Sequence, residues 1–158
     1  MCQYSSSNGR LTPWHMSHIG GIITRGPGLT FVEASAVVPQ GRITPEDAGI
    51  WTDDQAADWA AIVEFAHSQN QKIAMQLAHA GRKASNTAPW ISEVAIAGTE
   101  ANGWPEDVWG PSPVAFNDQH VVPKELSKEQ IKSLVEAFKS AAVRSIRAGF
   151  DVCNQTVQ

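Results

Sequence analysis

Residues Lys72 to Lys83 read KIAMQLAHAGRK, and this stretch decides the fold class. Its opening run, Lys72 to Ala78, is mostly apolar and has the length of a buried strand. The end of the run and the residues after it are polar or small: Gln76, His79, Gly81 and Arg82. Enzymes with α/β barrels place their chemistry at the carboxyl ends of the strands. The stretch therefore predicts a parallel strand that leads into a functional site.

The rest of the chain alternates between helical and strand patterns. Capping signals and apolar periodicity predict helices over Pro13 to about Thr24, from Thr52 to about Asn70, and from Ser127 to Gly149. Nearly continuous apolar runs predict strands over Leu29 to Val38, Lys72 to Ala78, and from Phe150 onward. This order is the α/β pattern of parallel strands. A (β/α)8 TIM barrel takes about 250 residues. The chain has 158, so we expect an incomplete barrel.

A long excursion from His79 to Pro123 separates the second predicted strand from the third predicted helix. It contains three of the six tryptophans, Trp90, Trp104 and Trp109. Connections of this length usually serve as lids or binding loops, or they contain small elements of their own. We expect a long loop or a hairpin here.

Composition and charge exclude several classes of protein. Hydrophobic residues make up 42% and charged residues 18%, which is a globular composition. The net charge of −4 gives no basic footprint for nucleic acid or for an anionic membrane. No apolar run approaches the roughly 20 residues of a spanning helix, and the amino terminus does not resemble a secretory signal. Cys2 and Cys153 could pair on paper, but free thiols in a reducing cytoplasm are expected.

Four separated stretches together resemble the old yellow enzyme family of FMN-dependent ene reductases. In chain order they are MCQYSS, LTPWHMSHIGG, VEASAVVPQGRITPEDAGIW and QLAHAGRKAS. The nearest likeness is to the YqjM-like branch, in which a cysteine precedes a tyrosine by two positions. The resemblance implies a (β/α)8 barrel that binds FMN at the carboxyl ends of its strands. It also implies hydride transfer from NADPH or NADH, through the flavin, to an activated alkene such as an enone.

The resemblance assigns roles to four residues. It implies that Cys2 lies beside the reactive edge of the flavin and tunes its potential, and that Tyr4 is catalytic and donates its hydroxyl to a substrate carbonyl. Ala34 would let the ring pass close to the strand. The carboxamide of Gln76 would pair with the polar edge of the flavin, which suits its donors and acceptor. The plainer alternatives are a terminal cysteine, a lone aromatic, a core alanine and a glutamine satisfied by neighbouring backbone.

Other polar residues are expected to serve the structure. The resemblance places His79 and Arg82 in the loop that supports the site, where structural hydrogen bonds are favoured. His15 and His18 lie three apart on a predicted helix, as a metal pair could. No third ligand is apparent in the sequence, so no metal is expected.

The chain departs from the family pattern at both ends. The first barrel strand would precede Met1, and residues 153–158 read CNQTVQ where the family has a Glu-Ile-His pattern. The histidine pair that polarises the substrate carbonyl and the groups that hold the FMN phosphate are therefore expected to be missing. We expect residues 1–152 to be the amino-terminal part of an FMN-binding barrel, followed by a divergent tail.

Two hypotheses follow from this departure. The chain is a truncated FMN-dependent NAD(P)H oxidoreductase, or it is a non-catalytic truncation product or half-barrel without flavin. Whether the chain itself is an enzyme stays open at this point. The open sheet edges of an incomplete barrel would favour self-association.

Overall fold

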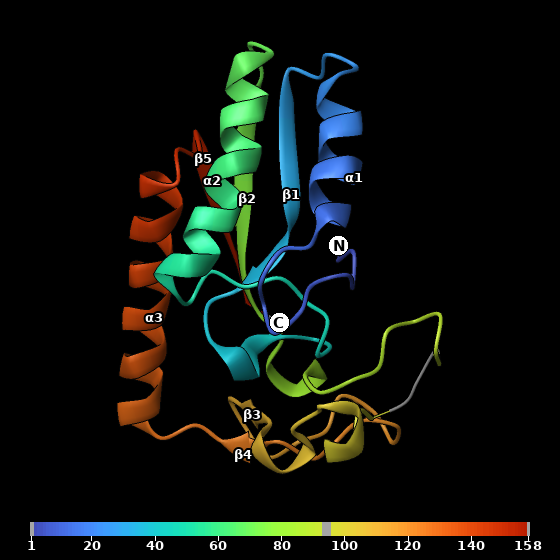
Figure 1. Cartoon of the computed structure of the whole chain (residues 1–158). Helices are drawn as coiled ribbons and strands as arrows, with labels where there is room; N and C mark the ends of the chain where they lie inside the picture. Colours follow the sequence, from blue (N-terminus) through green and yellow to red (C-terminus); the bar gives the residue numbers. More distant parts are fainter. Residues whose placement is uncertain (1, 93–95, 158) are drawn as a thin grey trace.

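The centre of the protein is a parallel three-stranded sheet in the order β1-β2-β5 (Figure 1). The computed structural model describes residues 2–92 and 96–157. The strands are β1 (Leu29–Ala36), β2 (Lys72–His79) and β5 (Val152–Val157). Both strand pairs are parallel, with Leu29 opposite Lys72 and Ala74 opposite Val152. The predicted α/β architecture is confirmed.

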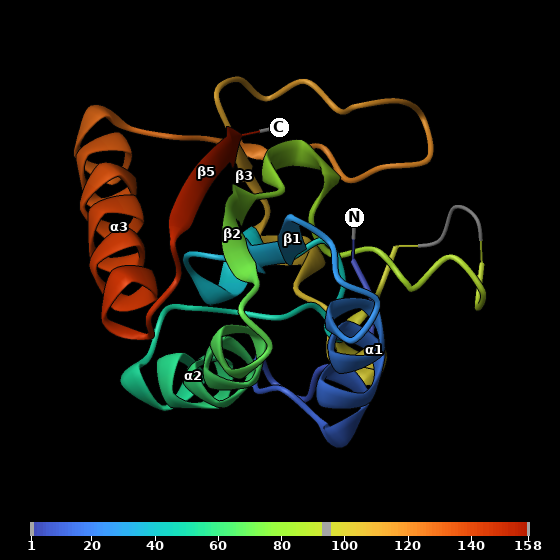
Figure 2. The same ribbon diagram turned by 90° about the horizontal axis from the view of Figure 1, so that it is seen from above.

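Three helices cover one face of this sheet: α1 (Pro13–Ile23), α2 (Asp53–Ser68) and α3 (Lys128–Arg147) (Figure 2). The predicted capping boxes start α2 and α3. The hydroxyl of Thr52 accepts from Gln55 N at 3.3 Å, and the hydroxyl of Ser127 accepts from Gln130 N at 3.2 Å. Gly149, with φ of +98°, follows the end of α3 as predicted, because the left-handed conformation there favours glycine.

The side chains of strand β2 point alternately toward the helix-covered core and toward the opposite face of the sheet. Its residues Ile73, Met75 and Leu77 are fully buried and pack against the helices. Trp59 of α2 lies in the same core, and its indole Nε1 donates to Gly49 O at 3.1 Å. The intervening residue Gln76 is turned toward the face that carries no helix, where it lines a cavity. This alternation positions the candidate site.

The face without helices exposes apolar side chains. Leu29, Phe31 and Val152 have 42%, 50% and 42% of their surface exposed. In a closed barrel this face would be the interior. Within residues 2–92 and 96–157 the sheet does not close on itself, which confirms the incomplete barrel. No helix in the same ranges is long and apolar enough to cross a bilayer.

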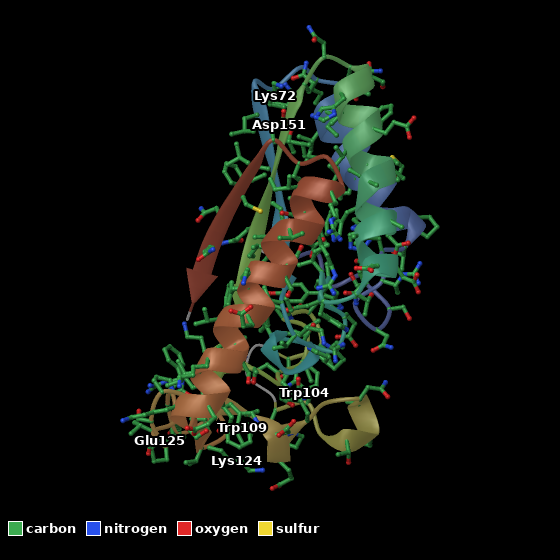
Figure 3. The ribbon with its side chains drawn as sticks, turned by 90° about the vertical axis from the view of Figure 1, so that its left-hand side faces the viewer. Lys72, Trp104, Trp109, Lys124, Glu125 and Asp151 are labelled. Atoms are coloured by element: carbon green, nitrogen blue, oxygen red, sulfur yellow. The ribbon has the colours of Figure 1, made fainter. Side chains whose placement is uncertain are left out.

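The described residues of the excursion between β2 and α3 form a long loop with short elements. Two of these, β3 (Trp109–Gly110) and β4 (Lys124–Glu125), run parallel to each other and so do not form a hairpin. Asn86 and Ile96 make an isolated antiparallel bridge in the same excursion. The excursion lies at the end of the molecule opposite Lys72 and Asp151 (Figure 3).

The last strand begins later and runs further than the sequence indicated. Phe150 belongs to the core, where its ring packs edge-on against Trp59 at 6.0 Å. Asp151 then binds the start of β2, accepting from Lys72 Nζ at 2.7 Å and from Ile73 N at 3.0 Å. Residues 153–157, expected as a divergent tail, continue β5. The boundary at 152 is therefore not a structural break.

Candidate functional site

A cavity of about 230 Å³ lies at the carboxyl ends of the strands. The four residues singled out from the sequence, Cys2, Tyr4, Ala34 and Gln76, all line it. Its remaining lining residues are Ala36, Gly41, Ile43, Asp47, Ala78, His79, Ala80 and Thr156. The fold thus brings together residues from the amino terminus, β1, β2 and β5. The roles assigned to them remain predictions.

Gln76 occupies the middle of the open face. It lies between Ala34 of β1 and Asn154 of β5 in the sheet register. Its Nε2 donates to Thr156 Oγ1 at 2.9 Å. The amide is therefore held by a side chain of β5.

Small side chains surround Gln76. Ala34 lies opposite Gln76 on β1, Ala78 lies two positions further along β2, and Ala36 lies opposite Ala78; all three line the cavity. The register between β1 and β2 shifts between Phe31 and Ala34, which sets the alanines beside Gln76. Alanines leave room for a flat group to approach the sheet closely.

The amino-terminal segment crosses the end of β1 and carries Cys2 and Tyr4. It is fixed there because Gln3 N donates to Glu33 Oε2 at 2.7 Å and Ser6 N donates to Glu46 O at 2.9 Å. Tyr4 has φ of +50°, a left-handed conformation that is uncommon for any residue with a side chain. Such strain tends to collect at functional sites.

The phenol of Tyr4 meets the excursion. Its ring packs edge-on against Trp90, with centroids 5.3 Å apart and planes at 80°. Trp90 itself is 67% exposed. The excursion therefore places one aromatic side chain, Trp90, against a residue that lines the cavity, as a binding loop would.

The cavity disfavours negative charge. Burial, followed by the charges of Asp47 and Glu33, raises the pKa of the Cys2 thiol. Burial also raises the pKa of Tyr4 to about 12, with smaller contributions from Cys2, Asp47 and Glu33. Both groups are consequently protonated at neutral pH and can act as hydrogen-bond donors.

Asp47 is a buried carboxyl group in the same cavity. Burial raises its pKa to about 6, although hydrogen bonds from Ile43 and Thr44 act in the opposite direction. Those bonds are 2.7 Å from Ile43 N to Oδ2 and 3.0 Å from Thr44 Oγ1 to Oδ1. The carboxyl group is thus fixed in position and titrates near neutrality.

His79 and Arg82 make structural hydrogen bonds, as favoured from the sequence. Gly81 N donates to His79 Nδ1 at 3.0 Å, and burial lowers the pKa of this histidine. His79 also lines the cavity, whereas Arg82 does not. Arg82 Nη2 donates instead to Ser112 Oγ at 3.4 Å.

The histidines of the first helix are separated by their surroundings. His15 is fully buried, and its Nδ1 accepts from Thr12 N at 3.1 Å, which caps α1. Its Nε2 lies 3.2 Å from Glu33 Oε1. His18 stacks on Trp14 at 5.9 Å. Both rings therefore have structural partners.

The sequence did not indicate two polar residues of the cavity, Asp47 and Thr156. Asp47 lies in a polar turn, and nothing in the pattern TPEDAG separates a buried carboxyl group from an exposed one. Thr156 lies in the segment expected to diverge. Only the pairing of β5 with β2 brings its hydroxyl to the site.

Comparison with known proteins agrees with this geometry. The sequence model of the NADH:flavin oxidoreductase / NADH oxidase family matches residues 1–154. The chain belongs to this family. The match begins at Met1 and reaches into β5, so it includes every residue of the cavity except Thr156.

Two curated relatives resemble the chain over nearly its whole length. An NADH:flavin oxidoreductase of Gibberella zeae is 53% identical over 153 residues, which are 96% of this chain and 37% of that protein. An NADPH dehydrogenase of Bacillus subtilis is 45% identical over 154 residues, 96% of this chain and 40% of that protein. The chain thus spans about two fifths of the length of these relatives.

Solved structures likewise match nearly the whole of this chain but only about two fifths of their own length. Morphinone reductase superposes with a TM-score of 0.77 at 26% identity, covering 98% of this chain and 41% of that one. The Old Yellow Enzyme from Pichia sp. AKU4542 superposes with a TM-score of 0.80 at 24% identity and supports the fold alone. It is covered over 40% of its length. The chain has the fold of the amino-terminal part of old yellow enzyme barrels.

Proposed function

We propose that the cavity binds the isoalloxazine ring of FMN, and that the chain is the amino-terminal part of an NAD(P)H oxidoreductase that reduces activated alkenes such as enones. The observation that carries the proposal is the convergence of Cys2, Tyr4, Ala34 and Gln76 on one cavity. Membership of a flavin oxidoreductase family supports it. A reducing compartment such as the cytoplasm suits the chain, because both cysteines are free thiols.

The donor set of the cavity fits the flavin ring. The floor contains Ala34, Ala36 and Ala78, which suits a flat aromatic system. The carboxamide of Gln76 offers two donors and an acceptor to the polar edge of the ring. The thiol of Cys2 is a weak donor that would lie beside the ring. When bound, FMN would supply hydride transfer between a nicotinamide and an electron-poor alkene carbon.

Tyr4 is the substrate-facing group in this proposal. Because its pKa is raised to about 12, its hydroxyl keeps its proton at neutral pH. A protonated phenol donates a hydrogen bond to a carbonyl oxygen and withdraws electron density from a conjugated alkene. Trp90, packed against the Tyr4 ring, would limit how a substrate enters.

The second candidate is a non-catalytic half-barrel that binds no flavin by itself. The open apolar face with Leu29, Phe31 and Val152 favours it, because exposed apolar surface of this kind promotes association with another chain. The hydrogen bond from Gln76 to Thr156 also favours it, since the amide already has a partner. Self-association through the open sheet edges belongs to this candidate.

Flavin binding and turnover separate the two candidates. The purified chain is mixed with FMN, separated from free flavin, and examined for visible absorbance. NADPH and NADH oxidation are then followed with cyclohexenone as the acceptor. Bound flavin and enone-dependent oxidation support the first candidate. A colourless, inactive chain that associates through its sheet supports the second.

A further inference from the structure

We propose that a second cavity, between the start of α3 and the excursion, binds a small neutral aromatic carboxamide. Among the described residues, His79 is the one that lines both this cavity and the cavity of the proposed function. The inference does not depend on FMN. It therefore goes beyond the proposed function and can fail separately from it.

This second cavity, called the α3 cavity below, has a volume of about 350 Å³, which is within the range of small-molecule sites in proteins. The first turns of α3 form one side of it, and the part of the excursion that carries Trp109 lies beside them (Figure 3). Gln40 and Ser133 line it and are exposed, so a ligand has access from solvent. The apolar side chains among its described lining are those of Val38, Trp109, Leu126 and Leu134.

His79 brings an unused hydrogen-bond donor to the α3 cavity. The residue is buried, with 7% of its surface exposed, and follows Leu77 by two positions, on the face of β2 that the helices cover. Gly81 N donates to its Nδ1 at 3.0 Å, so the proton of the neutral ring is on Nε2. Within residues 2–92 and 96–157, Nε2 has no hydrogen-bond partner. A buried donor of this kind gains from a ligand that accepts its proton.

Two glutamines add a second donor and an acceptor. Gln130 Oε1 accepts from Ser127 N at 2.8 Å in the capping box, which leaves Gln130 Nε2 unpaired in the described part of the chain. Gln40 Nε2 donates to Asp107 Oδ2 at 3.2 Å, and its Oε1 has no partner among the same residues. The two donors suit the carbonyl oxygen of a carboxamide, and Gln40 Oε1 suits its NH2 group.

The rest of the lining selects a neutral ligand with a flat apolar body. No lysine, arginine, aspartate or glutamate is among the described residues that line the α3 cavity. The desolvation of a charged ligand would therefore not be compensated there. The indole of Trp109 is held in place because its Nε1 donates to Asp107 Oδ1 at 2.7 Å, and its ring offers a surface for aromatic contact.

Benzamide is the probe, and its binding to the purified chain without FMN is followed by ¹H–¹⁵N NMR. We expect a Kd on the order of 1 mM. The largest shifts should occur at Trp109, at Gln130 and at Nε2 of His79. Benzoate and benzylamine carry a charge on a ring of the same size, and each should bind about tenfold more weakly or less.

Substitutions on α3 test the location of the site. Ser133→Phe places a ring in the α3 cavity and should raise the Kd for benzamide by about tenfold or more. Ser140→Phe is the matched control, because Ser140 is an exposed residue of the same helix that does not line the cavity. Its Kd should stay within about twofold of wild type.

Gln130→Glu tests the donor. It keeps a side-chain oxygen that can cap α3 but removes the amide protons, so the Kd for benzamide should rise about fivefold. If Ser133→Phe does not fold, this variant decides. A higher Kd then supports the proposal, and an unchanged Kd overturns it.

Four results with the probe would overturn the proposal. They are an absence of shifts up to the solubility limit of benzamide, shifts confined to Cys2, Ala34 and Gln76, equal affinity of wild type and Ser133→Phe, and an equal loss of affinity in Ser140→Phe. None of these results bears on whether the other cavity binds FMN.

Discussion

Gln76 Nε2 donates a hydrogen bond of 2.9 Å to Thr156 Oγ1, and this bond joins β2 to β5 across 80 positions of the chain. The amide proposed to hold FMN is thus engaged by the last strand. Binding of the ring would exchange this bond for new ones. The net gain from Gln76 is therefore smaller than that of a free amide.

Replacing Gln76 by alanine should weaken FMN binding. Loss of hydrogen bonds from one amide costs about 1 to 3 kcal/mol, which is a rise of roughly five- to 160-fold in Kd. Titration of FMN fluorescence with wild type and variant measures it. Gln71→Ala, in the turn before β2 and outside the cavity, is the control. Equal affinity for wild type and Gln76→Ala would remove Gln76 from the site.

Replacing Asp151 by asparagine should lower stability in a way that depends on pH. Lys72, His67 and the amide of Ile73 bind the carboxylate and hold the pKa of Asp151 well below its usual range. Because the folded pKa lies below the unfolded value of about 3.9, the stabilisation is complete above that value. It is lost as the pH falls through the folded pKa.

We therefore expect Asp151→Asn to lower the free energy of unfolding by about 1 kcal/mol at pH 7. The difference from wild type should shrink below about pH 4. Urea unfolding at several pH values measures both. Asp118→Asn, at an exposed position of the excursion, should have little effect. A difference that is the same at pH 7 and pH 3 would contradict the assignment.

Replacing Ser127 by alanine should destabilise α3. The hydroxyl caps the helix by accepting from Gln130 N, and loss of such a cap costs about 1 kcal/mol. Thermal or urea unfolding measures the change. Ser140→Ala, on the exposed side of the same helix, tests the substitution without the cap. Equal losses in the two variants would show that the cap contributes nothing specific.

Replacing Phe31 by lysine should reduce self-association. Phe31 is half exposed on the open face, next to the free edge of β1. A charge at an exposed sheet edge opposes pairing with another chain. Sedimentation velocity over a range of protein concentrations measures the association. Val122→Lys places the same charge on an exposed apolar position of the excursion. If both variants associate like wild type, the open face is not the contact.

Local signals in the sequence were sufficient to locate most of the helices and strands of the main sheet. The capping boxes at Thr52 and Ser127 and the glycine at 149 located the helices, because the bonds involved span only a few residues. The apolar run from Lys72 to Ala78 located β2, with Gln76 as the polar residue inside it. Family motifs then named Cys2, Tyr4 and Ala34, which the fold brings to one cavity.

Long-range pairing was not visible in the sequence. The excursion could have formed a hairpin, since nothing local fixes the direction in which Trp109 and Lys124 pair. Residues 153–157 departed from the family motif, yet they pair with β2, because backbone hydrogen bonds in a parallel sheet tolerate many side chains.

The sequence by itself determined the three α-helices, the first two strands of the main sheet, the family and the polar residue in the middle of β2. These depend on periodicity and on contacts between near neighbours. Only the tertiary structure decided that Thr156 holds Gln76, and that Asp47 is buried in the cavity that Cys2 also lines. Burial and charge at a site depend on segments far apart in the chain, so the titration of a carboxyl group or thiol is fixed by the fold as a whole.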